Sequence, residues 1–209
     1  MVKLNGPAMS MDASGSLNGT IVFSKWKGRN YARTLVRPAN PDTPAQKGTR
    51  TMMTFLSQAW KNLAETPQAS WTAPAKPNNV SGFNQFVSAN MKRWRQFTGP
   101  QQNFEPTTTN AATTIAGTPT VTGGQRNAAI AGTLTSGTNQ WGVIIFRATA
   151  AITTPNWNNA VAIVPMSGGT TFSYTDSPLD AGTYHYRFAA FTNDGQIGAA
   201  SADQTAIVT

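Results

Sequence analysis

Few residues in this 209-residue sequence have the types and spacing that catalysis or metal binding requires. His185 is the single histidine, and it lies between Tyr184 and Tyr186 in a predicted strand, where its side chain faces away from both. We therefore interpret His185 as a surface strand residue rather than a metal ligand or general base. Asp176 and Asp180 have the spacing of a carboxylate pair, but both fall in a predicted turn, where aspartate is common.

The motifs of common catalytic and nucleotide-binding sites are also missing. The chain contains no G-x-S-x-G, no Walker loop and no G-x-G-x-x-G. It has no cysteine, which excludes disulfides, a thiolate nucleophile and cysteine-based zinc sites. We expect a protein that is not an enzyme and that uses no cofactor and no metal.

A basic and aromatic stretch is the strongest candidate for binding. Lys25-Trp26-Lys27-Gly28-Arg29-Asn30-Tyr31-Ala32-Arg33 combines positive charge with two large rings, residue types enriched at contact hot spots. An acidic protein surface is the favoured partner, while phosphate contacts with base stacking and a merely solvated edge strand remain alternatives. Trp26 and Tyr31 either cap a small core or contact the partner. The predicted protein-contact residues are Lys25, Trp26, Lys27, Arg29, Tyr31, Arg33 and Arg37.

Charge is divided unevenly along the chain. Residues 1–104 hold thirteen Lys or Arg against three acids, whereas residues 105–209 hold three against five. This asymmetry indicates two parts with different partners. Only 11% of the residues are charged, which suits surfaces that become buried in assemblies. The start of the chain does not resemble a signal peptide, and no apolar run is long enough to span a bilayer, so we expect no membrane association.

The elements that position the basic stretch follow from local signals. Asn18-Gly19 favours a type I′ hairpin turn, and strands are predicted near 20–26 and 30–37 with a tight turn at 27–29. Pro38, Pro41 and Pro44 stiffen the connection that follows. Thr43-Pro44 begins a predicted helix at 44–65, Thr66-Pro67 begins a short helical piece that includes Trp71, and Ser81 caps a third helix. Lys92, Arg93 and Arg95 fall in the last turn of that helix, where they complement its dipole or form a solvated end.

The second half of the sequence has a different pattern. Residues 98–117 are polar and threonine-rich, and we place a linker at 101–117 between domains at 1–100 and 118–209. About seven short strands separated by turns then follow, the number expected of an immunoglobulin-like sandwich. The predicted fold class is therefore an α+β N-terminal domain, with short β-hairpin strands and two or three helices, followed by an all-β immunoglobulin-like sandwich.

Two resemblances extend this interpretation. Leu179, Gly182 and Tyr184 are similar to the E–F corner of fibronectin type III domains, with Tyr184 or Tyr186 as the corner tyrosine. Trp141 resembles the core tryptophan of such domains, although it sits later than usual. The resemblance covers about 118–209 and implies binding or spacing rather than catalysis.

Residues 15–94 resemble a family of small uncharacterised proteins encoded among phage and prophage structural genes. The resemblance rests on Lys27-Gly28-Arg29-x-Tyr31-x-Arg33, Pro38-x-Asn40-Pro41-x-Thr43-x-x-Gln46, Leu56-Ser57-Gln58-Ala59-Trp60-x-x-Leu63, Trp71 and Gly82-Phe83-Asn84-x-Phe86-Val87-x-x-Asn90. It implies a virion or virion-assembly context, and it implies no catalytic residues.

Together these features lead us to expect a virion structural protein of a tailed phage, made in the bacterial cytoplasm. A capsid decoration or minor head protein is the favoured role, anchored by its basic N-terminal domain and displaying the immunoglobulin-like domain. A tail, collar or adaptor component and a nucleic-acid-binding protein are the alternatives. Its expected partners are capsid or tail proteins, further copies of itself, and a host surface for residues 118–209.

Overall fold

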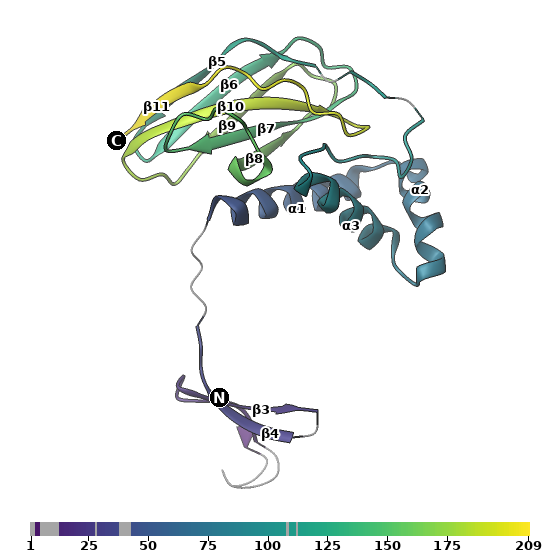
Figure 1. Cartoon of the computed structure of the whole chain (residues 1–209), viewed down its shortest axis with the longest axis vertical. Coiled ribbons are helices and arrows are strands. Elements are labelled where there is room, and N and C mark those ends of the chain that lie inside the picture. The colour runs from purple at the N-terminus through teal and green to yellow at the C-terminus, as the bar shows by residue number, and fades with distance from the viewer. Residues whose placement is uncertain (1–2, 5–12, 28, 38–42, 108, 112) are drawn as a thin grey trace. The chain divides into compact units, whose positions relative to one another are not determined.

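The chain forms two compact units, Met1–Pro41 and Asp42–Thr209. The computed structural model describes residues 3–4, 13–27, 29–37, 43–107, 109–111 and 113–209 (Figure 1). Helices and antiparallel sheets occur together, with mostly β content, so the general prediction of an α+β chain is confirmed. The division between the units differs from the expected domains at 1–100 and 118–209, because the three helices pack in one unit with the later strands.

The first unit is a single four-stranded antiparallel sheet, in the order β1-β2-β3-β4. Its strands are β1 (Lys3–Leu4), β2 (Ala13–Leu17), β3 (Ile21–Trp26) and β4 (Arg29–Thr34). Asn18 and Gly19 have φ of 44° and 66° in the β2–β3 turn, the left-handed values that the Asn-Gly pair predicts. The β3–β4 hairpin confirms the two predicted strands, although Gly28 of the expected turn and Pro38 and Pro41 of the following connection lie outside the described residues.

Three helices follow, and two of them begin at the predicted caps. The Thr43 side chain accepts a hydrogen bond from the Gln46 amide at 3.4 Å and caps α1 (Pro44–Asn62), and Ser81 accepts one from the Asn84 amide at 3.2 Å and caps α3 (Gly82–Arg95). Between them, α2 (Glu65–Ala75) begins before the expected Thr66-Pro67, with Ala64 at its N-cap. Proline at 67 is tolerated there, because the first turn of a helix has unpaired amides in any case.

Two further antiparallel sheets complete the second unit. One has the strand order β5-β6-β9, and the other has the order β11-β10-β7-β8. A cis peptide joins Ser177 to Pro178 in the connection from β9 to β10. The bounds of these strands are β5 (Ile115–Gly124), β6 (Asn127–Leu134), β7 (Gln140–Ala148), β8 (Ala160–Pro165), β9 (Thr171–Asp176), β10 (Gly182–Thr192) and β11 (Gln204–Val208).

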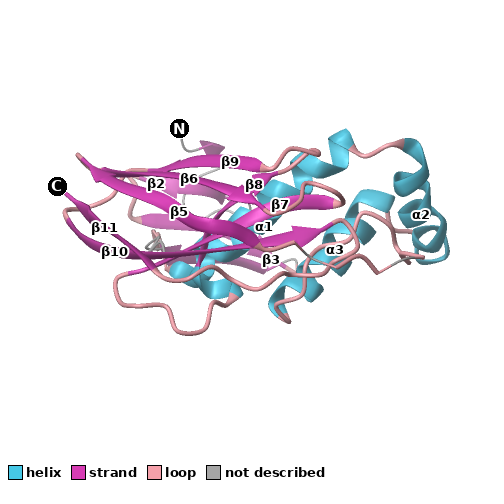
Figure 2. Ribbon diagram, turned by 90° about the horizontal axis from the view of Figure 1, so that it is seen from above, coloured by secondary structure: helices cyan, strands magenta, loops and turns pink. Residues whose placement is uncertain are grey.

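Two apolar cores lie on opposite faces of the β11-β10-β7-β8 sheet. Val143 and Ile145 of β7 pack with residues of the β5-β6-β9 sheet, and Phe188 of β10 belongs to the same core. The alternate residues of β7, Ile144 and Phe146, pack with the helices instead. Figures 1 and 2 show α1 running along β8 on this side of the sheet, where the Thr51 hydroxyl donates to the Val161 carbonyl at 2.9 Å.

Trp141 belongs to the core beneath the helices, not to the core between the two sheets. Its ring meets Phe55 of α1 edge-on at a centroid distance of 5.0 Å and Phe191 of β10 at 6.3 Å. The expected equivalence with the core tryptophan of fibronectin type III domains is therefore wrong. The position of Trp141 in the sequence already pointed against the equivalence, since it lies later than that tryptophan usually does.

The segment expected to be a free linker is tied down at its start. Asn90 of α3 is fully buried and clamps Gln101, accepting from its amide at 2.7 Å and donating to its carbonyl at 3.1 Å. The Gln101 side chain also donates to the Asp194 carbonyl at 3.0 Å. The Trp71 indole donates to the Gln102 carbonyl at 2.6 Å. These bonds join the helices to the β10–β11 connection, which explains why no unit boundary falls near residue 100.

Candidate functional site

The basic stretch is divided between β3, the following turn and β4. In the hairpin register, Val22, Ser24 and Trp26 pair with Arg33, Tyr31 and Arg29 respectively. Tyr31 is 41% exposed, and Arg33 beside it on the same face of β4 is also exposed.

The other predicted contact residues extend this surface along the chain. Lys27 is exposed in the turn, with φ of 47°, and Arg37 is exposed beyond the end of β4. Lys25, Trp26 and Arg29 have described backbones, but their side chains lie outside the described residues. Tyr31 is therefore a surface residue and does not cap a core, while its contact with a partner stays a prediction.

Asp176 and Asp180 do not form a carboxylate pair. The Asp176 carboxylate is buried, receives the Arg147 guanidinium at 2.6 Å and accepts a hydrogen bond from the Tyr186 hydroxyl at 3.0 Å. Asp180 is almost fully exposed and lies 3.7 Å from Arg126. Burial, with the Asp176 charge adding to it, raises the pKa of Tyr186 above its ordinary value. This cluster has the properties of a structural ion pair.

His185 has an acidic partner that the sequence analysis missed. Its Nδ1 lies 2.6 Å from the Asp203 carboxylate, whose other oxygen accepts a hydrogen bond from the Ile152 amide. The neighbouring Arg187 donates to the Ile152 and Thr153 carbonyls at 3.0 and 2.8 Å. These contacts attach the segment after β7 to β10 and β11, so they account for His185 and Asp203 without a catalytic role.

The basic end of α3 is partly structural as well. Arg93 donates to the Gly99 carbonyl at 2.9 Å and to the Gly195 carbonyl at 3.3 Å. Burial lowers the pKa of Arg93 from its ordinary value, and the nearby Asp194 charge opposes this change. Arg93 therefore holds α3 to the β10–β11 connection and is not available as a surface contact.

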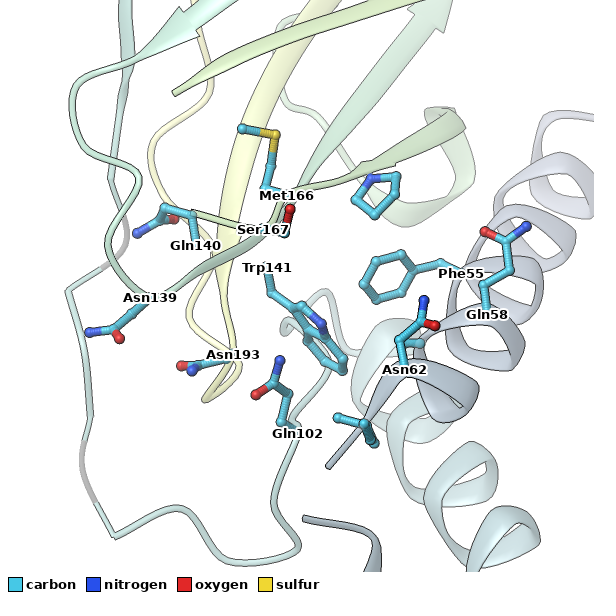
Figure 3. A pocket seen from close by; sticks show the side chains of 13 residues that line it. Phe55, Gln58, Asn62, Gln102, Asn139, Gln140, Trp141, Met166, Ser167 and Asn193 are labelled. Atoms are coloured by element: carbon cyan, nitrogen blue, oxygen red, sulfur yellow. The ribbon is translucent and has the colours of Figure 1, made fainter. Parts of the chain in front are cut away.

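A cavity of about 460 Å³ lies between α1 and the strand ends of β7, β8 and β10 (Figure 3). This volume falls within the range of roughly 300–1,000 Å³ that small-molecule sites occupy. Phe55, Trp141 and Met166 supply its apolar walls. None of the residues that line it is charged. Six amide side chains surround the walls: Gln58, Asn62, Gln102, Asn139, Gln140 and Asn193.

The fold brings these amides together from segments far apart in the sequence. Gln58 and Asn62 are four residues apart on α1 and share one face of that helix. Gln102 follows Gln101, which is bound by Asn90, and Asn193 directly follows the long strand β10. Sequence reasoning missed the cavity, because only the i, i+4 spacing on α1 was visible and the other amides look like ordinary turn residues.

Comparisons with known proteins add no assignment. No protein-family model matches the sequence, and no curated protein matches it either. Within the described part of the chain, no three His, Asp or Glu residues are grouped so that they could hold a metal ion. Over the same residues, no helix combines the length and apolar character needed to cross a membrane.

Proposed function

We propose that the protein is a non-enzymatic structural component of a tailed-phage particle, docked to an acidic surface of another virion protein through its N-terminal sheet. Capsid decoration, or another minor role in the head, is the favoured location. The resemblance of residues 15–94 to small uncharacterised proteins encoded among phage and prophage structural genes motivates the virion context. The physical support comes from the incomplete burial of the first unit.

That incomplete burial is the observation on which the proposal rests. Where side chains between residues 15 and 37 are described, none is buried. Ile21 and Val36 are 38% and 65% exposed. Chains of about 40 residues seldom fold stably without disulfides, metals or association, and this chain has no cysteine. A sheet of this kind gains its missing burial by docking on a partner.

The charge of the sheet indicates what that partner presents. Arg33 is exposed two residues from Tyr31 on the same face of β4, and Arg37 is exposed beyond the end of that strand, so the unit offers positive charge and an aromatic ring. An acidic protein surface complements both, with charge guiding the approach and the ring supplying contact area.

In this proposal the second unit is the domain that the docked protein displays. We infer that residues 118–209 form a fibronectin type III-like sandwich, with three strands in one sheet and four in the other. Of the two candidate corner residues, Tyr184 makes the expected bond: its hydroxyl donates to the Asp180 carbonyl at 3.0 Å. Such a module suits display or spacing.

A binding assay on particles tests the docking role. Purified particles lacking the protein are incubated with the tagged full chain and with a variant carrying Arg33→Glu and Arg37→Glu. We expect the charge reversal to weaken binding strongly, while the matched control Arg126→Glu, an exposed arginine of the second unit, leaves it unchanged. Equal binding by all three proteins would refute docking through the N-terminal sheet.

Two further measurements separate the alternatives. Hundreds of copies per particle indicate decoration, whereas six or twelve indicate a tail, collar or adaptor ring. Titration with DNA at low and high salt tests nucleic-acid binding, since phosphate contacts predict a steep loss of affinity with salt. Tight, salt-sensitive DNA binding without particle binding would replace the virion proposal.

A further inference from the structure

Several polar groups around the cavity beside α1 have no partner within the protein. Among the described residues, no hydrogen-bond partner contacts the side-chain amides of Gln58, Asn62, Gln102 or Asn193. Figure 3 shows the Gln102 and Asn62 amides on either side of the Trp141 ring. Each amide offers both donors and an acceptor, so the cavity presents a set of open groups of both kinds.

The indole of Trp141 is a second, independent indication of a ligand. Trp71 and Trp94, which are also buried, donate their Nε1 hydrogens to the carbonyls of Gln102 and Gly48 at 2.6 and 3.1 Å. Trp141 is only 8% exposed, yet no acceptor from the described residues contacts its Nε1. Buried tryptophans usually satisfy this donor. Here it borders the cavity, where a ligand oxygen can reach it.

The lining excludes two of the three broad ligand classes. A charged ligand would lose its hydration without gaining an opposite charge, because no charged side chain lines the cavity. A wholly apolar ligand would cover the open amides and leave them without water or any other partner. An uncharged ligand with many hydroxyl groups and an apolar ring face satisfies both conditions.

We propose that this cavity binds an uncharged saccharide. Its hydroxyl groups donate to and accept from Asn62, Gln102 and the neighbouring amides, and one ring oxygen or hydroxyl accepts from Trp141 Nε1. Phe55, Trp141 and Met166 contact the carbon face of the sugar ring. This inference concerns the second unit alone and does not depend on docking by the N-terminal sheet.

Indole NMR signals of the full chain provide a direct test. The sequence has six tryptophans, and the spectrum of Trp141→Phe identifies which signal belongs to Trp141. The probes are glucose, galactose, mannose and N-acetylglucosamine, with glucuronate as a charged counterpart and sorbitol as a polyol without a ring face. We expect at least one neutral sugar to shift the Trp141 signal, while the signals of the internally bonded Trp71 and Trp94 change little.

Two single variants locate the site. Asn62→Ala and Gln102→Ala each remove an amide that faces the cavity, and each weakens sugar affinity about fivefold, the effect of one hydrogen bond. Asn84→Ala is the matched control, since it removes an exposed helical amide outside the cavity and leaves the affinity unchanged.

Three results would overturn the proposal. One is the absence of any neutral-sugar shift at concentrations well above about 1 mM, the weak end of specific affinities. Another is equal binding of glucuronate or sorbitol, which would remove the argument from charge and ring shape. The third is a sugar affinity that neither Asn62→Ala nor Gln102→Ala changes, which would place binding elsewhere.

Discussion

Replacing Asp176 by alanine should destabilise the second unit more than any substitution at the neighbouring Asp180. The Asp176 side chain is 7% exposed, and it receives both the Arg147 guanidinium and the Tyr186 hydroxyl. The variant leaves a buried cation and a buried hydroxyl without their acceptor. Removing one partner of such a buried pair costs about 3–5 kcal/mol of unfolding free energy.

Urea unfolding followed by tryptophan fluorescence measures this loss. With an m-value of about 2 kcal/mol per molar urea, Asp176→Ala lowers the unfolding midpoint by about 2 M. Tyr186→Phe removes only the hydroxyl contact and leaves the ion pair, so we expect it to lower the unfolding free energy by about 1–2 kcal/mol. Asp180→Ala is the matched control, because its carboxylate is 95% exposed and its contact with Arg126 is solvent-screened.

The comparison of the two aspartates also gives the refuting result. If Asp176→Ala and Asp180→Ala lower the midpoint equally, the buried network contributes nothing particular and the structural assignment of Asp176 fails. Should Asp176→Ala be too unstable to purify, Asp176→Asn keeps one acceptor oxygen and is expected to fall between the wild type and the loss predicted for alanine. A wild-type midpoint for Asp176→Asn would contradict the argument as well.

Three further predictions follow from the same structure. Because the pKa of Tyr186 is raised, its phenol stays protonated in the folded protein at pH values where it ionises in the unfolded chain, so stability falls as pH rises above about 10. Tyr186→Phe should reduce this loss, measured by urea unfolding at alkaline pH. An equal decrease of unfolding free energy with pH in both proteins would contradict the prediction. Gly48→Ala should lower the melting temperature and the unfolding free energy, the latter by about 1–3 kcal/mol, because a Cβ there would lie 2.1 Å from the Trp157 carbonyl oxygen. A higher melting temperature, which helix propensity alone predicts, would refute this. The fragment 42–209 should remain a soluble monomer in gel filtration. The shorter fragment 118–209 should aggregate, because it lacks the helices that cover one apolar face of its sheet. A monomeric fragment 118–209 would contradict the description of two cores.

Local signals predicted the elements well because their causes are local. Thr43 and Ser81 cap their helices through hydrogen bonds that span three residues, and Asn18-Gly19 turns a hairpin by its own backbone preference. Charge asymmetry, in contrast, was a poor guide to the division of the chain. Net charge describes solubility and partners and contains no information about which faces pack together.

One sequence signal for the packing of helices on the sheet was present but not used. The run Trp141-Gly142-Val143-Ile144-Ile145-Phe146 is apolar without alternation, which is typical of a strand covered on both faces. A sandwich with one face in solvent requires polar residues at alternate positions. The run therefore implies a second layer over β7, and α1 and α3 supply it.

The candidate cavity could not have been predicted in the same way. Its amides come from α1, the segment after α3, the start of β7 and the residue after β10, and Asn90 holds Gln101 and with it the neighbouring Gln102 against the helices. Asparagine and glutamine in turns have a sufficient local explanation, so their types alone do not indicate a site. What distinguishes them is the missing partner, which is a property of the folded chain.

The two units differ in how far their side chains are buried. Asp42–Thr209 encloses two apolar cores of its own, so the cavity beside α1 belongs to a unit with extensive internal packing. Within the described part of Met1–Pro41 no side chain is buried, so under the proposed function this sheet would gain stability by docking on its partner. The proposal then predicts that substitutions at its exposed residues change assembly far more than they change the unfolding of the second unit.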